Sequence, residues 1–178
     1  MILATVGTHE DPFDRLLKEL DRLCATGAIT EPVFCQSGYC TFEPAHVTCA
    51  RQLPFEELQQ KMREARVIIT HGGPATIMQA LAHGKVPLVV QRQASFGEHV
   101  DDHQVRFANK ISDRVFPVID IEDLGPLIAS YEERVAALPA GGDGRERARE
   151  FAGKMDALCT EVLARPRWRL WKPRVNRP

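Results

Sequence analysis

The chain has 178 residues, of which 44% are hydrophobic, and its formal net charge is −1. This length and composition predict one soluble globular domain. No run approaches the roughly 20 apolar residues of a membrane-spanning helix, and no basic stretch precedes the first apolar run, so we expect a cytoplasmic protein without a signal peptide. The five cysteines have no C-x-x-C spacing, which argues against a disulfide framework and against a zinc site.

The charge is unevenly distributed along the chain. Residues 165–178 contain six basic residues and no acidic ones, so the first 164 residues carry −7. We therefore predict a globular domain at 1–164 and a separate basic C-terminal tail at 165–178. Trp168 and Trp171 suit the interface of an anionic membrane, and a solvated tail is an equally good alternative. The acidic body argues against nucleic acid as a partner.

The first third of the chain alternates between strand and helix patterns. A buried strand at 2–6 stops at the turn Gly7-Thr8-His9. Leucines at helical spacing then predict a helix from Asp11, as N-cap, to about Gly27. Short strands are expected at 32–36 and 47–50, and a helix from Pro54 to about Ala65.

The central stretch predicts a strand, a tight turn and a helix. A β-branched run at 67–70 is followed by His71-Gly72-Gly73 and by helical spacing over 75–83. Glycines allow the backbone to approach a ligand closely, and the first N–H groups of a helix lack internal partners. Such a turn binds anions, phosphate above all.

A second polar loop, residues 91–104, follows the next apolar strand at 86–90. Consecutive parallel strands end at the same edge of a sheet, so this loop and the glycine turn should converge. Side chains suited to phosphates and hydroxyls are dense in this loop, among them Asp102, His103 and Gln104. Two polar loops converging on one edge predict a binding site.

The remaining elements complete the alternation. We expect a helix at 99–111, a strand at 115–119, a helix at 121–138, a linker at 139–144 and an amphipathic helix at 148–163. The whole pattern predicts an α/β fold, a doubly wound, Rossmann-like parallel sheet with helices on both faces.

Several motifs together resemble the C-terminal, donor-binding half of family 28 glycosyltransferases, which have the two-domain GT-B architecture. The matching segments, which cover residues 1 to about 125, are 5–9, 12–16, 53–55, 69–81, 84–90 and 96–104. More closely, the chain resembles the small subunits of two-part enzymes that build bacterial exopolysaccharides. In that group the donor-binding half is a separate chain, so the resemblance implies a membrane-anchored partner subunit that binds a lipid-linked acceptor.

The resemblance also implies roles for individual residues. The donor is expected to be a UDP-sugar whose diphosphate is held by the first loop, the glycine turn and the Thr76 hydroxyl. The implied donor-binding residues are Gly7, Thr8, Phe55, His71, Gly72, Gly73, Thr76, Gln79, Asp102, His103 and Gln104. Phe55 marks the uracil pocket, and Asp102, His103 and Gln104 face the transferred sugar. Gln79 departs from the family, because many relatives have a glutamate there for the ribose hydroxyls, so a weaker or altered ribose contact is expected.

The chemistry requires stabilising the departing phosphate and deprotonating the acceptor hydroxyl. Helix N-termini serve the first need, and no D-x-D motif is present, so we expect neither a metal nor another cofactor. His71, His99 and His103 form no known ligand pattern on one helix face. His9 is the candidate to contact the diphosphate or to assist the acceptor, with a base on the partner as the alternative.

Three other functions remain open at this stage. They are a stand-alone transferase acting on a small molecule, a non-catalytic nucleotide-sugar-binding regulatory subunit, which Gln79 favours, and a dinucleotide-binding oxidoreductase. The first turn lacks G-x-G-x-x-G, which counts against the oxidoreductase. The resemblance favours a hexosyltransferase working at the inner face of the membrane through its partner.

Overall fold

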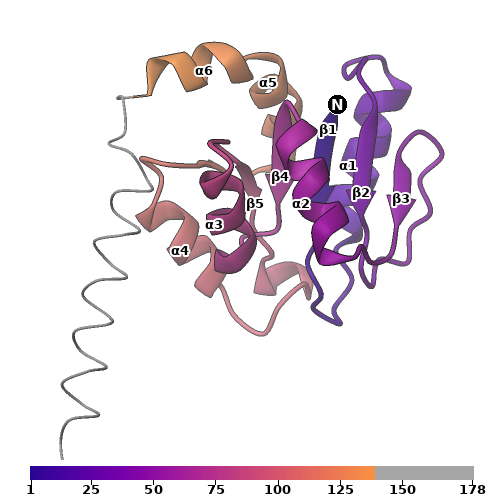
Figure 1. Cartoon of the computed structure of the whole chain (residues 1–178). Helices are drawn as coiled ribbons and strands as arrows, with labels where there is room; N and C mark the ends of the chain where they lie inside the picture. The colour runs from indigo at the N-terminus through magenta and orange to yellow at the C-terminus, as the bar shows by residue number, and fades with distance from the viewer. Residues whose placement is uncertain (139–178) are drawn as a thin grey trace, which may run out of the picture. The chain divides into compact units, whose positions relative to one another are not determined.

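The computed structural model describes residues 1–138, in which strands and helices alternate (Figure 1). The strands are β1 (Ile2–Thr5), β2 (Val33–Gln36), β3 (Thr48–Ala50), β4 (Val67–Thr70), β5 (Leu88–Val90) and β6 (Phe116–Val118). The α-helices are α1 (Asp14–Ala25), α2 (Phe55–Glu64), α3 (Pro74–Ala82), α4 (His103–Lys110), α5 (Leu124–Ala129) and α6 (Tyr131–Ala137). Two short 3-10 helices are η1 (Ala94–Phe96) and η2 (Ile121–Asp123). The linker, the amphipathic helix and the basic tail expected after residue 138 lie outside the described residues.

All the strands pair in parallel, in the order β3-β2-β1-β4-β5-β6. The chain moves outward from β1 to β3 and then returns to the other side of β1 with β4. This order is a doubly wound, Rossmann-like sheet, as predicted. Within residues 1–138, no helix has the length and apolar character needed to cross a membrane.

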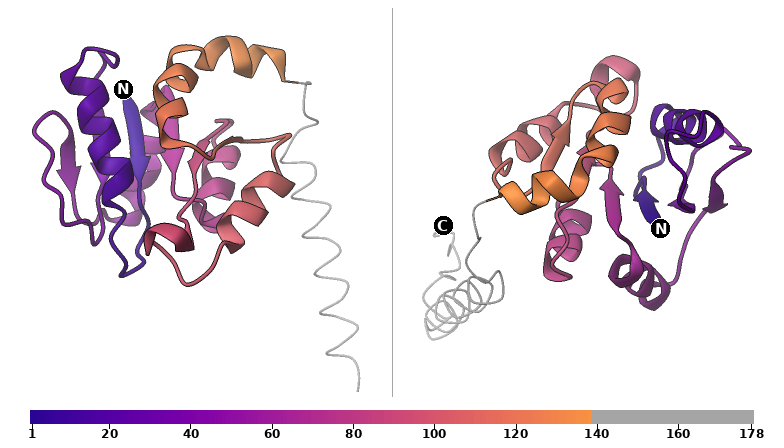
Figure 2. Two further views of the ribbon diagram at one scale, coloured as in Figure 1. Left: turned by 180° about the vertical axis from the view of Figure 1, so that it is seen from behind. Right: turned by 90° about the horizontal axis from the view of Figure 1, so that it is seen from above.

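Helices cover both faces of the sheet, as the views from the front, the back and above show (Figures 1 and 2). Ile2 and Ala4 of β1 pack in one buried cluster with leucines of α1 and with Leu124 and Ile128 of α5. Leu3, between them, joins the opposite cluster with residues of α2 and α3. A third cluster joins α3 to α4. Strands buried on both faces explain the continuous apolar runs that the sequence shows.

The first helix begins later than predicted. Helix α1 starts at Asp14, with Phe13 as its N-cap residue, and not at Asp11. The backbone N–H of Asp11 donates to His9 Nδ1, and its carbonyl accepts from Arg92 Nη1 at 2.7 Å. The local bond to His9 and the long-range bond to Arg92 hold the residues before α1 outside the helix. The prediction of Asp11 as the N-cap is therefore wrong.

Two later helices also differ from prediction. The helix expected at 99–111 begins only at His103, because the Asp102 carboxylate accepts from the backbone N–H of Ala94 and so holds the preceding turns. The helix expected at 121–138 is η2 followed by α5 and α6. It breaks at Ser130, whose hydroxyl and backbone N–H both donate to the Pro126 carbonyl.

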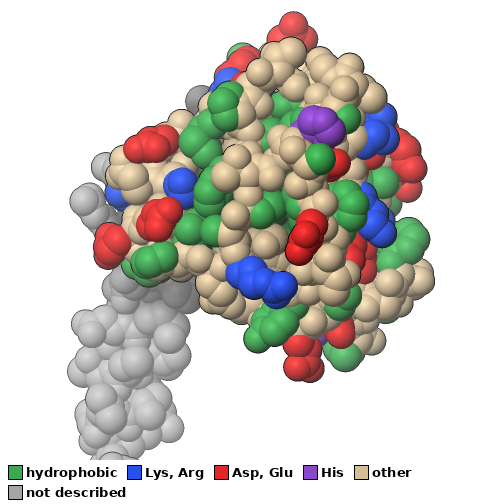
Figure 3. All heavy atoms as spheres, turned by 90° about the vertical axis from the view of Figure 1, so that its right-hand side faces the viewer, with side chains coloured by type: hydrophobic (Ala, Val, Ile, Leu, Met, Phe, Trp, Pro, Cys, Tyr) green, Lys and Arg blue, Asp and Glu red, His purple; other side chains and the backbone are tan. Residues whose placement is uncertain are grey.

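The surface beside β3 carries no single type of side chain. Figure 3 shows that acidic and basic side chains are interspersed there with hydrophobic ones. This mixture is typical of an ordinary solvated face. The candidate site lies instead at the carboxyl ends of the strands.

Candidate functional site

The carboxyl ends of β1 and β4 lie side by side where the strand order reverses. Thr5, the last residue of β1, is paired with Thr70, the last residue of β4. The turns at 7–9 and 71–73 therefore leave the sheet next to each other, and the loops at this edge lie at the bottom of Figure 1. Doubly wound sheets bind their ligands in the crevice at this switch point.

The His71 ring fills the space between the two turns. A Cβ added to Gly7 would lie 2.5 Å from His71 Cε1, and one added to Gly73 would lie 2.4 Å from His71 Nε2. The φ angles of Gly7 and Gly72, +78° and +89°, lie in the left-handed region, which glycine adopts without strain. Burial of the ring, followed by the nearby charge of Arg92, lowers the pKa of His71 to about 4. The buried His71 ring is thus uncharged, and its contacts leave no room for a side chain at Gly7 or Gly73.

Helix α3 begins with backbone N–H groups that have no partner in the helix. Gly73 is its N-cap residue, no side-chain cap is present within residues 1–138, and the first turn has no acid. Pro74 lacks an N–H, and the N–H of Ile77 is already bonded to the Gly73 carbonyl. The N–H groups of Ala75 and Thr76 therefore remain for an anion, and the helix dipole favours negative charge there.

Buried polar atoms gather at the same strand ends. Thr70 Oγ1, His71 Nδ1 and both amide atoms of Gln91 are buried without a hydrogen-bond partner among residues 1–138. Thr70 ends β4, and Gln91 directly follows β5. Nearly all buried polar groups in folded proteins have a partner, so such atoms mark a place where a ligand or ordered water completes the structure.

The residues predicted to contact ribose and base lie on α2 and α3. The Gln79 carbonyl Oε1 accepts from Gln59 Nε2 at 3.1 Å, which leaves the Gln79 amide as a free donor. The Gln59 carbonyl in turn lies 2.6 Å from His83 Nε2. Phe55, the first residue of α2, is 61% exposed, so core packing does not account for it. Both roles stay predictions.

A fully buried arginine holds the second loop against the first. Arg92 Nη1 donates to the carbonyls of Asp11 and Glu98 at 2.7 and 3.0 Å, and Nη2 donates to the Val6 carbonyl at 3.0 Å. The Glu98 carboxylate makes two 2.9 Å hydrogen bonds with the Arg15 guanidinium. Arg92 and Glu98 belong to the polar loop at 91–104 that was predicted to bind a ligand, but these contacts give them a supporting role.

The three residues predicted to face the sugar have different surroundings. Gln104 is buried, its Oε1 accepts from the Arg92 backbone N–H at 3.4 Å, and its side chain lies against Gly72. The Asp102 carboxylate is exposed and bonded to its own loop through Ala94. The His103 ring is 45% exposed. His103 is therefore the best placed of the three to reach a sugar directly.

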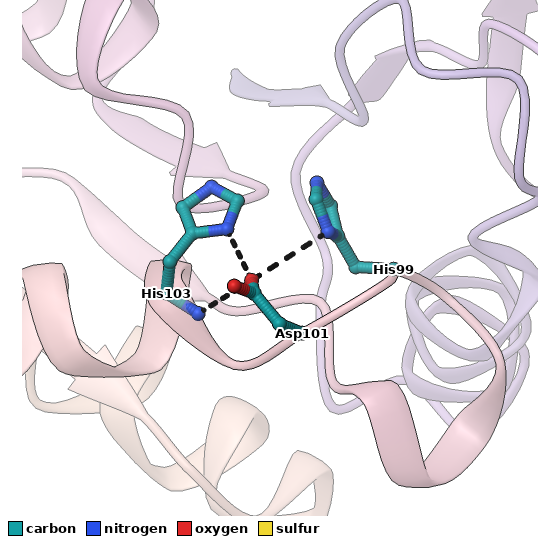
Figure 4. Close-up of side chains that lie close together, drawn as sticks. All are labelled: His99, Asp101 and His103. Carbon is teal, nitrogen blue, oxygen red and sulfur yellow. Dashed lines mark hydrogen bonds and ion pairs between the residues drawn. The ribbon is translucent and has the colours of Figure 1, made fainter.

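Three histidine rings lie in a row at this edge. The His9 and His99 ring centroids are 4.6 Å apart, as are those of His99 and His103. Burial, followed by the charges of His103 and His9, lowers the pKa of His99. Figure 4 shows that His99 and His103 both point toward the Asp101 carboxylate, which lies between them. Helical spacing does not bring His99, Asp101 and His103 together, so the sequence did not predict this cluster.

A hollow of about 490 Å³ lies beside α1, away from the glycine turns. Its lining includes Arg15, Lys18, Phe96 and Glu98 but none of the glycines of the two turns. The polar strand ends described above, and not this hollow, carry the chemistry of the candidate site.

Comparison with known protein families bears directly on this site. The model of the glycosyltransferase family 28 C-terminal domain matches residues 1–133. The chain belongs to this family. The match includes both glycine turns and the second polar loop, so this edge is part of what the family 28 domain comprises. The resemblance to the C-terminal half of family 28 glycosyltransferases is confirmed, and the closer resemblance to subunits of exopolysaccharide-building enzymes stays a prediction.

The individual relatives described below have low sequence identity to this family 28 domain. The crystal structure described as the glycotransferase of kitacinnamycin has a TM-score of 0.54 at 18% identity, over 78% of this chain and 35% of that one, which supports the GT-B fold. MurG of Acinetobacter baumannii has a TM-score of 0.47 at 23% identity, over 74% of this chain and 40% of that one. A 7-carboxy-7-deazaguanine synthase of Halobacterium salinarum is 28% identical over 131 residues, 74% of this chain and 46% of that protein. The chain thus spans less than half of each.

Proposed function

We propose that this chain is the donor-binding subunit of a glycosyltransferase, which transfers a hexosyl group from a UDP-sugar to a lipid-linked acceptor during exopolysaccharide synthesis. A membrane-bound partner would supply the acceptor site and hold the complex at the inner face of the membrane. The observation that carries the proposal is the uncapped N-terminus of α3, which opens beside two glycine turns at the switch point of a family 28 domain.

In this proposal the diphosphate sits at the start of α3. The N–H groups of Ala75 and Thr76, with the Thr76 hydroxyl, stabilise the charge that grows on the leaving nucleoside diphosphate. Because these dipoles are fixed before the reaction, no metal is needed for this step. Uracil would stack on the exposed Phe55 ring, and the free amide of Gln79 would donate to a ribose hydroxyl.

Transfer breaks the bond from the anomeric carbon to the phosphate and forms one to the acceptor oxygen, whose proton goes to a base. His9 Nδ1 accepts the Asp11 N–H at 3.2 Å, so the neutral ring carries its proton on Nε2. An Nε2–H suits donation to a phosphate oxygen better than removal of a proton. We therefore assign His9 to the diphosphate and the base to the partner subunit.

Calorimetric titration of the purified full-length chain with UDP, UDP-sugars and NAD, with and without Mn²⁺, tests the proposal. We expect saturable UDP binding that needs no Mn²⁺, and no binding of NAD. Thr76→Val removes one hydroxyl donor and should weaken UDP binding roughly tenfold, the effect of one hydrogen bond of about 1.5 kcal/mol to a charged group.

Thr48→Val is the matched control, because Thr48 is an exposed threonine on β3, far along the sheet from α3. UDP affinity that is equal in Thr76→Val and in the control would remove the assignment of the phosphate site. Absence of UDP binding to the wild-type chain would refute a preformed donor site.

A regulatory subunit that binds the donor without catalysing transfer is the second candidate, because Gln79 replaces the glutamate expected from the resemblance. Co-expression with the membrane partner and measurement of sugar transfer separates the two. A roughly tenfold rise of the KM for the UDP-sugar in Thr76→Val supports catalysis at this site, whereas kinetics unaffected by that change support the regulatory alternative.

A further inference from the structure

His99, Asp101 and His103 bring two imidazoles and one carboxylate to a single point. One ligand atom from each lies within 4.8 Å of the other two. His103 Nδ1 is 2.5 Å and His99 Nδ1 is 4.0 Å from Asp101 Oδ1. His99 and Asp101 lie on the loop before α4 and His103 is the first residue of α4, and their three side chains reach the same side, as Figure 4 shows.

We propose that His99, Asp101 and His103 form a binding site for a divalent transition-metal ion of the zinc class. Two nitrogen ligands and one oxygen ligand suit Zn²⁺, Co²⁺ or Ni²⁺, whereas Mg²⁺ and Ca²⁺ prefer oxygen ligands throughout. Three protein ligands leave further coordination positions for water or an anion. The site goes beyond the proposed sugar transfer, which needs no metal.

The observed spacing is close to what coordination requires. Ligand atoms about 2.0–2.2 Å from one tetrahedral ion are roughly 3.4 Å apart. The Asp101 to His103 contact must lengthen by about 1 Å and the His99 contact must shorten by less than that, which small side-chain rotations achieve. Asp101 and His103 are about half exposed, while His99 is 10% exposed and fixes the site against the protein. Metal binding would replace the Val100 N–H that donates to His99 Nδ1 at 2.9 Å, and it would compete with the Arg106 guanidinium 3.6 Å from Asp101 Oδ2.

Helix capping alone does not explain this arrangement. Asp101 Oδ1 accepts the His103 backbone N–H at 3.0 Å, which accounts for the aspartate at the start of α4. It does not account for an imidazole on each side of the same carboxylate, one of them only 10% exposed, or for the His9 ring 4.6 Å from that of His99. His9 is the nearest further imidazole, but it comes from the loop after β1 and already pairs with Asp11.

The test uses the full-length chain, stripped with a chelator and without any nucleotide, so its outcome is independent of the donor site. Zn²⁺ is titrated by calorimetry, and Co²⁺ by its visible absorption. We expect one saturable equivalent of each, with Zn²⁺ displacing Co²⁺. His99→Ala, His103→Ala and Asp101→Asn should each weaken Zn²⁺ binding at least tenfold, with the folded circular dichroism spectrum unchanged.

Two control variants test whether Zn²⁺ binds elsewhere, at another histidine–carboxylate pair or at a cysteine thiolate. The half-exposed His46 imidazole lies 3.2 Å from the Asp21 carboxylate, and within residues 1–138 this pair belongs to no cluster of three ligand side chains, so His46→Ala should leave Zn²⁺ affinity unchanged. Cys49→Ser removes an exposed thiol that lies opposite Cys35 and would report a thiolate site instead. Absence of saturable binding would overturn the proposal. So would loss of binding in either control with retention in His99→Ala.

Discussion

The contact between His71 and the glycine turns predicts that Gly73→Ala destabilises the wild-type protein but stabilises a His71→Ala variant. The backbone of Gly73, with φ −68° and ψ 124°, is accessible to alanine, so only the neighbouring ring opposes a side chain there. The added Cβ would lie 2.4 Å from His71 Nε2, about 1 Å inside the 3.4 Å at which ordinary contact begins. Gly73→Ala should therefore destabilise the protein by about 1–3 kcal/mol, the cost of overpacking a filled site.

Removal of the ring reverses the expectation. In a His71→Ala background the Gly73→Ala side chain meets free space, and the lower entropy of the unfolded chain stabilises the protein by about 0.4–1 kcal/mol. The coupling energy between the two changes should be about 2–3 kcal/mol. Gly7 provides the contrast, since its φ of +78° keeps Gly7→Ala destabilising by roughly 1–2 kcal/mol even without the ring.

The coupling energy is measured by urea unfolding of four proteins: the wild type, Gly73→Ala, His71→Ala and the double variant. The experiment is done at pH 7.5, where the His71 imidazole is neutral. With a slope of about 1–3 kcal/mol per M, the midpoint of Gly73→Ala should fall by about 1 M in the wild-type background and rise in the His71→Ala background. An equal loss of stability in both backgrounds would show that the ring is not what forbids a side chain at position 73.

Three further predictions concern stability and binding. Arg92→Met should cost about 3–5 kcal/mol in urea unfolding, because three buried carbonyls lose their donor; a loss below 1 kcal/mol would contradict the supporting role of Arg92. As the pH falls from 6.5 to about 4, the unfolded state takes up a proton on His71 before the folded state does, so stability should fall by up to about 3 kcal/mol, and this share should be missing in His71→Ala. Gln79→Glu should tighten UDP binding by about 3–10-fold in calorimetry, because a carboxylate that accepts from a ribose hydroxyl makes a stronger, charge-assisted hydrogen bond than the one the Gln79 amide donates, and Gln59 can still donate to it; unchanged or weaker binding would refute this difference.

The sequence predicted the sheet well because the information is local. The central strands β1, β4 and β5 are short apolar runs buried on both faces, and each turn after β1 and β4 is marked by glycine. The strand order then follows from the right-handed connections of parallel strands. The same local signals placed the two glycine turns and the second polar loop at one edge.

Contacts between distant residues explain what the sequence did not predict. Asp11 before Pro12 has the pattern of a helix start, but its carbonyl is bonded to Arg92, 81 residues later. An arginine in a polar loop is usually exposed, and its burial depends on carbonyls that no local pattern reveals. The cluster of His99, Asp101 and His103 has no helical spacing, because only His103 belongs to α4 and the other two lie on the preceding loop.

Arg92 also determines when the binding edge forms during folding. Its partner Val6 lies 86 residues earlier in the chain, and the sheet can pair β1 with β4 before this contact exists. Closing so long a loop costs chain entropy, so the arginine should leave water late, after the strands have assembled. During synthesis on the ribosome, both glycine turns emerge before Arg92 and Glu98 do. A nascent chain that ends between them could pair β1 with β4, but the edge that carries both glycine turns would still lack the second loop.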